Sequence, residues 1–232
     1  MDEFARFELL IGKEKMQKLK QSTVLILGLG GVGSYATESL VRSGIGHFIL
    51  VDFDVIDITN LNRQLMATQE NIGEYKVDVW EKRIRQINPL ARITKIQQKL
   101  LPQDIEPLFQ TYAFQYVIDA CDTVSTKCAL IKACLNHHTT IISSMGTGNK
   151  MDPTQLEIID IRKTSYDPLA RVIRKMIKDM KMNQKVMVVC SKERPQKRND
   201  PIIASNAFVP ATAGLFCASY IVDRIVGEKN EH

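Results

Sequence analysis

Residues 28–33 form a glycine-rich segment that could bind a phosphate. Its glycines are Gly28, Gly30, Gly31 and Gly33. An apolar run, residues 23–27, precedes the segment and a helical pattern follows it, which is the strand–turn–helix context of nucleotide-binding turns. Glycine lets the backbone turn tightly and approach a phosphate closely, and the free N–H groups at the start of the helix point at the anion. Asp52 lies nineteen residues beyond Gly33, where an acidic side chain can accept hydrogen bonds from ribose hydroxyls.

Polar side chains recur beyond this point, where the strands of a sheet are expected to end. They are Asp54, Asn60, Arg63, Gln64, Lys76 and Asp122. Hydride transfer needs no such cluster, since the nicotinamide cofactor does the chemistry. Attack of a carboxylate on the α-phosphorus of ATP does need it, because charge builds on the phosphoryl oxygens and on the departing pyrophosphate. We therefore expect an ATP site in which Arg63 and Lys76 neutralise phosphate charge. Asp122, together with Asp54, would hold Mg²⁺ through oxygen ligands.

Each of these residues also has a structural alternative. Arg63 could form a surface ion pair, Lys76 could be a solvated residue in the first turn of its helix, and Asp122 could cap a helix. The whole chain has alternatives as well: a nicotinamide enzyme, or a nucleotide-binding regulatory protein without turnover. An ATP site should be stabilised against heat by ATP with Mg²⁺ and much less by NAD.

A parallel α/β sheet would bring these side chains together, and the apolar pattern predicts one. Residues 24–27 have the pattern of a strand, residues 32–43 that of an amphipathic helix, and residues 47–51 that of a second strand. Strand, helix and strand within about thirty residues form a right-handed crossover unit. We expect a Rossmann-like, doubly wound, mostly parallel sheet whose polar loops leave the carboxyl ends of the strands.

The remaining elements continue this alternation. We predict strands over residues 93–96, 116–122, 140–144, 156–161 and 186–189, and helices over residues 76–87, 102–110, 125–138 and 168–180. Two short helices are expected within residues 5–20. The length of 232 residues suits one well-filled core. We therefore expect a single domain over residues 1–232, with a helical arm at 1–22 and substrate-facing strand and helix additions at 150–232.

Positive charge is concentrated in residues 162–198. This segment contains twelve Lys or Arg and three acidic residues, a net charge of +9 in a chain of +5. Its predicted helix, residues 168–180, places basic side chains on one face and apolar side chains on the other. A basic stripe and loop suit a partner with a phosphate backbone. The alternative is a solvated helix face with extended lysine side chains.

The composition is that of an ordinary globular protein, with 44% apolar and 25% charged residues. Its five cysteines include no C-x-x-C pair, which predicts neither a disulfide framework nor a zinc site and favours a cytoplasmic setting. Cys190 is the cysteine that we expect to be exposed near positive charge, although an ordinary role is favoured there. Residues 202–222 carry no charge and approach the length of a membrane span. Their Pro, Gly, Ser and Asn residues favour instead a buried strand or loop followed by a core helix.

Five segments carry a family resemblance. They are Gly28-Leu-Gly-Gly-Val-Gly33, Asp52-Phe-Asp54, Thr59-Asn-Leu-Asn-Arg-Gln64, Ile72-Gly-Glu-Tyr-Lys76 and Ile118-Asp-Ala-Cys-Asp122. In order and spacing they resemble the ubiquitin-activating-enzyme-like adenylating family. The positions that match residues contacting ATP or its metal in that family are Asp52, Arg63, Lys76 and Asp122. The resemblance also implies a homodimer in which Arg6 reaches the ATP of the other subunit.

Within this family the second half of the chain resembles the tRNA threonylcarbamoyladenosine dehydratases, through residues 148–155, 160–165 and 167–170. This implies that ATP activates the threonyl carboxylate as an acyl-adenylate. The carbamoyl oxygen then closes on it, giving a cyclic oxazolone with loss of water. Residues 162–198 would lie on tRNA phosphates, which predicts salt-dependent binding. The alternative is an activator that contacts a ubiquitin-like or sulfur-carrier protein, but such members usually carry two C-x-x-C zinc pairs.

Overall fold

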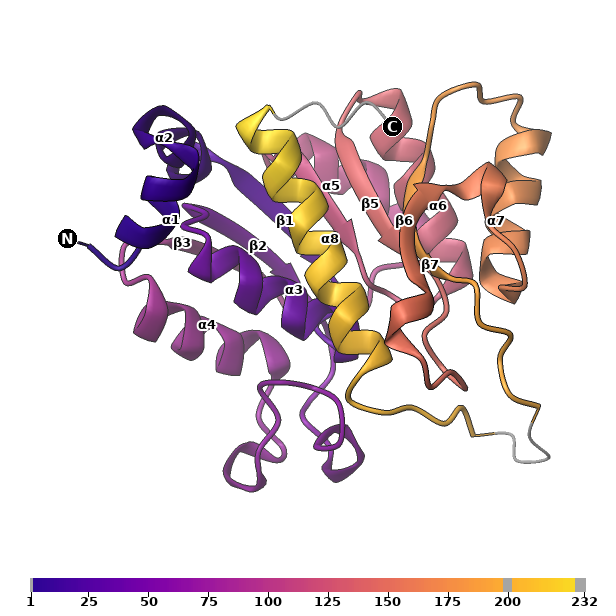
Figure 1. Ribbon diagram of the computed structural model, residues 1–232, viewed down its shortest axis with the longest axis horizontal. Coiled ribbons are helices and arrows are strands. Elements are labelled where there is room, and N and C mark those ends of the chain that lie inside the picture. Colours follow the sequence, from indigo (N-terminus) through magenta and orange to yellow (C-terminus); the bar gives the residue numbers. More distant parts are fainter. Residues whose placement is uncertain (1, 198–201, 228–232) are drawn as a thin grey trace.

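The computed structural model describes residues 2–197 and 202–227, where strands and helices alternate along the chain (Figure 1). The strands are β1 (Thr23–Leu27), β2 (His47–Val51), β3 (Arg92–Ile96), β4 (Tyr116–Asp119), β5 (Thr140–Ser144), β6 (Leu156–Asp160) and β7 (Met187–Ser191). The helices are α1 (Ala5–Ile11), α2 (Lys13–Gln21), α3 (Gly31–Arg42), α4 (Lys76–Ile87), α5 (Ile105–Thr111), α6 (Val124–Asn136), α7 (Pro168–Asp179) and α8 (Val209–Val226). The long connection between β2 and α4 extends below the sheet in the view of Figure 1.

The strands form one sheet in the order β3-β2-β1-β4-β5-β7-β6, which confirms the predicted mostly parallel α/β fold. Neighbouring strands are parallel except β6 and β7, which pair antiparallel at one edge. From the adjacent strands β1 and β4, the chain builds the sheet outward in opposite directions. In open α/β sheets such a reversal of strand order leaves a crevice beyond the carboxyl ends of the strands, where ligands bind.

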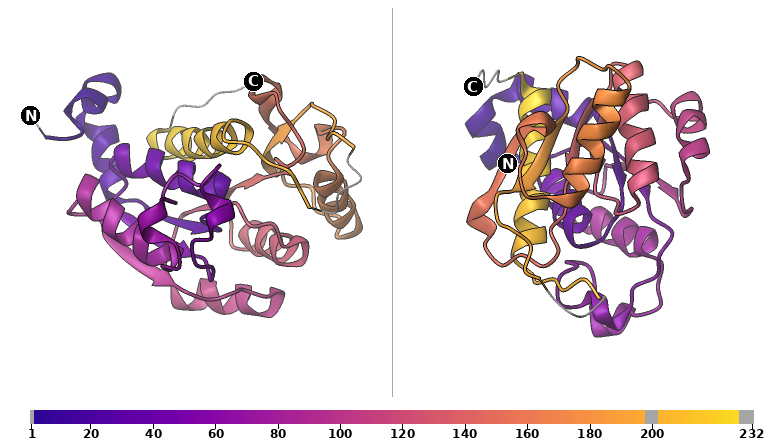
Figure 2. Two further views of the ribbon diagram at one scale, coloured as in Figure 1. Left: turned by 90° about the horizontal axis from the view of Figure 1, so that it is seen from below. Right: turned by 90° about the vertical axis from the view of Figure 1, so that its right-hand side faces the viewer.

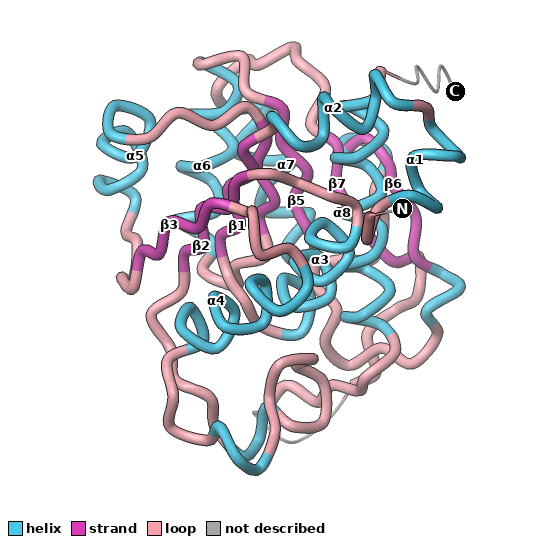
Figure 3. The backbone as a smooth tube through the Cα atoms, turned by 90° about the vertical axis from the view of Figure 1, so that its left-hand side faces the viewer, coloured by secondary structure: helices cyan, strands magenta, loops and turns pink. Residues whose placement is uncertain are grey.

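The side chains of the central strands alternate between two apolar layers, one on each face of the sheet. In β1, Val24 and Ile26 pack into one layer, whereas Leu25 and Leu27 pack into the other, as a pleated strand requires. Helices α2, α3, α4 and α8 cover the first layer, and α5, α6 and α7 cover the second. Figure 2 shows α8 and α6 on opposite faces of the sheet, and Figure 3 shows the same for α4 and α5.

The uncharged residues 202–222 form a loop followed by the core helix α8, as predicted. Gly214 lets α8 approach α3 closely, since a Cβ at this position would lie 2.3 Å from the carbonyl oxygen of Val32. Cys217 and Ile221 are fully buried. Among the described residues, α8 is the one helix with the length and apolar composition of a membrane span, and half of it is buried inside the protein. Packing between α3 and the sheet therefore accounts for its composition.

Several predicted elements differ from those observed, among them β7, which ends at Ser191 rather than at residue 189, and α6, which ends at Asn136 rather than at residue 138. Strand β4 ends at Asp119 rather than at residue 122, because the chain turns there beside the glycine segment and the Ala120 N–H donates to the Leu27 carbonyl at 2.9 Å. The buried face of α7 is narrower than predicted. Val172 and Met180 are 45% and 40% exposed, whereas Ala170, Ile173 and Ile177 are buried. Part of the apolar face of α7 therefore lies on the surface.

The N-terminal arm is less separate than expected. Met16 and Leu19 of α2 are buried in the layer shared with α3 and α8, so α2 belongs to the core. The basic segment is described up to residue 197, and its last residue, Arg198, lies outside the described residues. The same holds for the end of the charged loop predicted over residues 192–201.

Candidate active site

The glycine segment forms a tight turn between β1 and α3. Gly28 has a φ of +90°, and a Cβ there would lie 2.8 Å from the carbonyl oxygen of Ala120. A Cβ at Gly33 would lie 1.8 Å from the Gly28 oxygen, so neither position accommodates a side chain. Gly30 is the residue before α3 and provides no side-chain cap. The first N–H groups of α3 therefore remain available to an anion.

Asp52 follows β2 and links the glycine turn to the next loop. Its Oδ2 accepts a hydrogen bond from the Leu29 N–H at 2.6 Å, and its Oδ1 accepts one from the Asp54 N–H at 2.9 Å. Burial raises the pKa of Asp52 above the usual value for aspartate, although nearby Lys76 opposes this shift. A carboxylate accepts more than two hydrogen bonds, so Asp52 can hold the turn and still accept from ribose hydroxyls.

Lys76 is the first residue of α4 and is only 4% exposed. Its Nζ lies 2.8 Å from Oδ2 of Asp54 and 3.9 Å from Oδ1 of Asp52. The alternative of a solvated first-turn lysine is therefore wrong. A buried ammonium that faces two carboxylates is held in one place, which suits a group that must meet phosphate oxygens.

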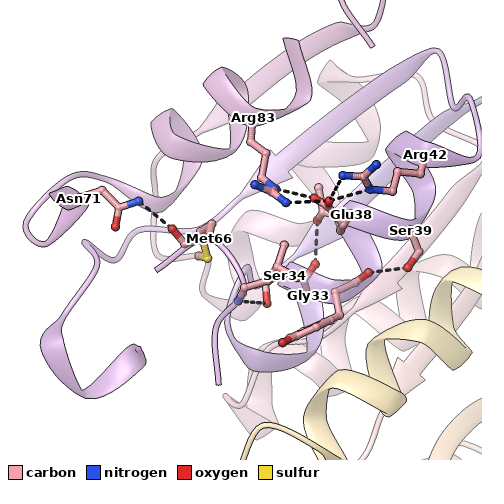
Figure 4. Close-up of polar contacts among 11 residues, drawn as sticks. Gly33, Ser34, Glu38, Ser39, Arg42, Met66, Asn71 and Arg83 are labelled. Carbon is pink, nitrogen blue, oxygen red and sulfur yellow. Dashed lines mark hydrogen bonds and ion pairs between the residues drawn. The ribbon is translucent and has the colours of Figure 1, made fainter. Parts of the chain in front are cut away.

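The polar loop before α4 is fixed by short-range hydrogen bonds and by α3. Oδ1 of Asn60 accepts from the Asp57 N–H at 3.1 Å, which closes the first turn of the loop. Oγ of Ser34, near the start of α3, accepts from the Leu65 N–H at 3.2 Å (Figure 4). The loop therefore keeps a defined position relative to the phosphate-binding end of α3.

Arg63 and Gln64 lie on this loop and keep hydrogen-bonding capacity for a ligand. Nη1 of Arg63 donates to the Thr59 carbonyl at 2.7 Å and to Oδ1 of Asn62 at 2.8 Å. No ion pair of Arg63 occurs in the described part of the chain, so the surface ion pair is not formed. Gln64 is 5% exposed, and its Oε1 has no hydrogen-bond partner within the described residues. A buried amide oxygen without a partner is unfavourable, and a ligand donor would satisfy it.

The end of β4 is supported from below by a buried polar cluster. Nζ of Lys127 lies 2.7 Å from Oδ2 of Asp119 and donates to Oγ of Ser143 at 3.1 Å. Oδ1 of Asp119 accepts from the Cys121 N–H at 3.3 Å, which fixes the start of the following loop. Asp122, one residue further, is exposed, and α6 begins after Thr123. Asp122 therefore does not cap this helix.

These elements surround one cavity of about 880 Å³. The predicted site residues that line it are Gly28, Gly30, Gly31, Asp52, Asp54, Asn60, Arg63, Gln64, Lys76 and Asp122. Gly33 is not among the lining residues, and its lack of a side chain lets α3 pack closely against Gly28. Arg6 is exposed on α1 and is not among the lining residues of its own chain. The volume lies in the range of ligand sites.

Sequence reasoning missed the lining residues that come from the β3–α5 connection and from the residue after Asp52. Gln98, Lys99 and Leu100 follow the carboxyl end of β3, and Phe53 lies beside them, with Nζ of Lys99 5.2 Å from the centre of its ring. Their place after a parallel strand was the available signal. An aromatic ring and a leucine beside the ribose-binding carboxylate can accommodate a base.

The prediction that Cys190 is exposed near positive charge is wrong. Cys190 is 3% exposed, because β7 lies between β5 and β6 rather than at the surface. Burial, reinforced by Asp167, raises the pKa of its thiol to about 12. Cys190 is therefore a neutral packing residue at neutral pH. Cys134 and Cys217 are buried, whereas Cys121 and Cys128 are partly buried.

Asp54 and Asp122 fit a magnesium ion only when a bound nucleotide provides further oxygen ligands. No group of three or more His, Cys, Asp or Glu side chains that could hold a metal occurs within the described residues. In ATP sites Mg²⁺ usually takes one or two protein carboxylates, and phosphate oxygens and waters complete its shell. The exposed Asp122 on the cavity suits one such ligand. Asp54 already accepts from Lys76, so a metal would share that carboxylate.

The arrangement resembles that of an enzyme that acts on the α-phosphate of a nucleotide, and comparisons with known proteins agree. The sequence model of the ThiF family matches residues 4–232. The chain belongs to the ThiF family. The match includes the C-terminal additions as well as the glycine turn and the polar loop.

Two relatives resemble this ThiF-family chain over nearly its whole length. The tRNA threonylcarbamoyladenosine dehydratase of Bacillus subtilis is 42% identical over 96% of this chain and 94% of the relative. The crystal structure of the Escherichia coli tRNA N6-threonylcarbamoyladenosine dehydratase, in complex with ATP, superposes with a TM-score of 0.91 at 33% identity, covering 97% of this chain and 94% of that chain. The sulfur carrier protein ThiS adenylyltransferase of Escherichia coli is 33% identical, but over only 60% of this chain and 54% of the relative.

Proposed function

We propose that the protein is an ATP-dependent tRNA threonylcarbamoyladenosine dehydratase. The observation that carries the proposal is the 42% identity with the Bacillus subtilis enzyme over 96% of the chain. Similarity of this extent includes the additions after residue 150. The sulfur-carrier adenylyltransferase is similar over only 60% of the chain. The cavity lined by Asp52, Arg63 and Lys76 is the site at which we expect the chemistry.

In the first step the threonyl carboxylate attacks the α-phosphorus of ATP. A new P–O bond forms to the carboxylate, and the bond to pyrophosphate breaks. Negative charge then builds on the α-phosphoryl oxygens and on the leaving group. The N–H groups at the start of α3, the Lys76 ammonium and the Arg63 guanidinium would stabilise this charge.

In the second step the carbamoyl oxygen attacks the acyl carbon and AMP leaves. The carbamoyl nitrogen that bears the threonyl carbon loses its proton, which gives the C=N bond of the oxazolone ring. The oxygen atom of the lost water ends on AMP. Because both reacting groups belong to one substrate, no cysteine nucleophile is needed, in keeping with the buried thiol of Cys190.

We propose that Asp122 and Asp54, which line the same cavity, provide the protein ligands for Mg²⁺. When bound, this ion would neutralise charge on the phosphates of ATP. Asp54 also pairs with Lys76 at 2.8 Å, so its carboxylate would connect the metal to the buried ammonium. Asp52 remains the residue for the ribose.

We further propose a homodimer that works in the cytoplasm on tRNA. The exposed basic side chains of α7, among them Arg171, Lys175 and Lys178, would contact tRNA phosphates. Leu9 and Leu10 of α1 are 85% and 78% exposed, and a second copy would cover them. Arg6 lies on the same helix and would enter the partner's cavity.

The test uses purified protein, ATP, Mg²⁺ and tRNA that carries threonylcarbamoyladenosine. The expected products are AMP, pyrophosphate and a nucleoside that is lighter by one water, as measured by mass spectrometry. Pyrophosphate exchange into ATP that depends instead on a protein ending in Gly-Gly would identify a carrier-protein activator. Failure with authentic modified tRNA would overturn the proposal.

A further inference from the structure

Two buried lysine–aspartate pairs lie beyond the ends of neighbouring strands. Lys127 pairs with Asp119 at 2.7 Å after β4, and Lys150 pairs with Asp167 at 2.8 Å after β5. All four residues are at most 2% exposed. Burying charges costs free energy even when they are paired, and a hydrophobic replacement is often as stable. The two pairs therefore call for a role other than general stability.

The Lys150–Asp167 pair joins the turn after β5 to the start of α7. Nζ of Lys150 also donates to the Gly146 carbonyl at 2.6 Å, so it spans the turn from within. Oδ1 of Asp167 accepts from the Ala170 N–H at 2.9 Å and caps α7. A Cβ at Gly146 would lie 3.0 Å from Oδ2 of Asp167, which shows how closely the turn and the cap pack.

The same turn binds both the segment that ends at residue 197 and the segment that begins at residue 202. The Asn149 N–H donates to the Ala204 carbonyl at 2.8 Å, and Oδ1 of Asn149 accepts from the Ala204 N–H at 2.9 Å. The Asn149 carbonyl accepts from the Gln196 N–H at 2.7 Å. Nδ2 of Asn206 donates to the Lys150 carbonyl at 2.7 Å. A displacement of the turn would therefore move all of these segments.

The turn after β5, the start of α7 and residues 203–205 together form a part of the cavity wall that is separate from the nucleotide motifs. Its lining residues include Met145, Thr147, Pro168, Leu169, Ile203 and Ser205. This wall is largely apolar with a few polar groups, as ligand subsites are. It continues into α7, whose outer face carries the positive charge. A group attached to tRNA and held on that face would meet this wall.

We propose that this wall is the subsite for the amino-acid end of the substrate, a carbamoylated amino acid carried on an adenosine, and that Lys150 and Asp167 are the positioning residues that hold it. The inference rests on the proposed function. The side chains of Lys150 and Asp167 are 0% and 1% exposed, so they act through the backbone of the turn and not by touching the substrate. Misplacement of reacting groups by about 1 Å can lower a rate about 100-fold.

The test removes both charges at once, with Lys150→Met and Asp167→Asn in one chain. Methionine keeps the length of lysine, and the asparagine amide oxygen can still cap α7. We expect turnover of modified tRNA to fall about 100-fold, with a higher KM for that tRNA. The Kd for ATP without tRNA should stay within about twofold of the wild-type value, because the nucleotide motifs lie on other elements.

The matched control is the other pair, Lys127→Met with Asp119→Leu, in which leucine removes the acceptor of the Cys121 N–H. Because Asp119 fixes the loop that carries Asp122, this variant should weaken ATP binding at least about tenfold, the loss expected for a buried hydrogen bond to a charged group. Melting curves establish that both variants are folded at the assay temperature. If the Lys150 variant does not fold, Asp167→Asn alone can be tested, because it keeps Lys150 and the cap. It should also lower turnover of modified tRNA without changing the Kd for ATP, but to a smaller degree.

The inference is wrong if the Lys150 variant keeps wild-type turnover, or if its ATP affinity falls as much as its turnover. Either result would contradict only the inference, because the proposed function concerns the reaction of the wild-type protein. A wild-type protein that removes no water from modified tRNA would instead overturn the proposed function. The two failures are therefore distinguishable.

Discussion

At the scale of single residues, Lys76 is a buried cation on the wall of the cavity. Its ammonium is held between Asp52 and Asp54 at the cavity. Replacement of Lys76 by Met should lower ATP-dependent AMP formation about 100- to 1000-fold, the range found when one donor to a developing anion is removed. Lys82→Met, on the exposed side of the same helix, should leave the rate within about twofold. Equal losses in both variants would argue against a role in charge stabilisation.

Asp52 should make ATP binding sensitive to acid. Burial raises the pKa of Asp52, so it takes up a proton at a higher pH than an ordinary aspartate. At neutral pH, ionisation of the buried Asp52 lowers the free energy of unfolding. This penalty disappears when the pH falls below the pKa of Asp52 in the unfolded chain. For the site, protonation removes an acceptor of the Leu29 N–H and of ribose. The Kd for ATP, measured by calorimetry from pH 7 downward, should therefore rise before the fold is lost, and Asp52→Asn should be weak and nearly independent of pH.

At the scale of elements, Glu38 ties α3 to α4 and so sets the glycine turn relative to Lys76. Its carboxylate accepts from Nε and Nη2 of Arg83 at 2.6 and 2.8 Å and from Nε of Arg42 at 2.8 Å (Figure 4). Glu38→Gln should lower the free energy of unfolding by about 2 kcal/mol, as for a hydrogen bond to a charged group. Urea denaturation at pH 7 measures this. Glu14→Gln, at an exposed pair with Lys18, should change it by less than about 0.5 kcal/mol.

The same contact predicts the direction of a pH effect. Burial opposes ionisation of Glu38, but the hydrogen bonds from Arg83 and Arg42 outweigh it and hold its pKa below the usual value for glutamate. An acid with a lowered pKa stabilises the fold above its unfolded-state pKa and loses that contribution as the pH falls through its folded-state pKa. The stability difference between wild type and Glu38→Gln should therefore be complete at pH 7 and shrink below about pH 4.5. A difference that grows in acid would contradict this account.

At the scale of the whole molecule, α7 presents a group of exposed basic side chains. Exchange of the three exposed basic residues Arg171, Lys175 and Lys178 for Gln should weaken binding of modified and unmodified tRNA alike. Each lost phosphate contact should reduce the salt dependence of log K by about one. Fluorescence titrations at several salt concentrations measure both effects. Gln at Lys13, Lys18 and Lys82, on other helices, removes the same charge and should change neither the affinity nor the slope.

The proposed dimer makes a prediction about shared sites. If Arg6 acts in the partner's cavity, a dimer of one Arg6→Ala chain and one Lys76→Met chain contains one complete site. Each variant alone should be inactive, whereas an equal mixture, after exchange of subunits, should recover about a quarter of the wild-type rate. Sedimentation confirms the oligomeric state of each sample. No recovery from mixed dimers would mean that Arg6 does not act across subunits.

Local patterns in the sequence determined much of the fold and the nucleotide end of the site. The runs at β1 and β2 are apolar throughout because both faces of a parallel sheet are covered. Glycine at positions 28 and 33 reflects a steric requirement of one turn, which sequence spacing reveals directly. Asp52 and Lys76 could be assigned to the crevice because the carboxyl ends of parallel strands share one edge.

Only the tertiary structure decided which polar side chains are buried and with whom they pair. Cys190 lies next to charged residues in the sequence, yet β6 covers β7 and leaves the thiol buried. Lys150 and Asp167 are seventeen residues apart, and their pairing depends on α7 returning to the turn after β5. Periodicity describes one element at a time, whereas burial and ion pairing depend on the elements that pack against it. The cavity wall that we propose as the amino-acid subsite therefore emerged only from the packed structure.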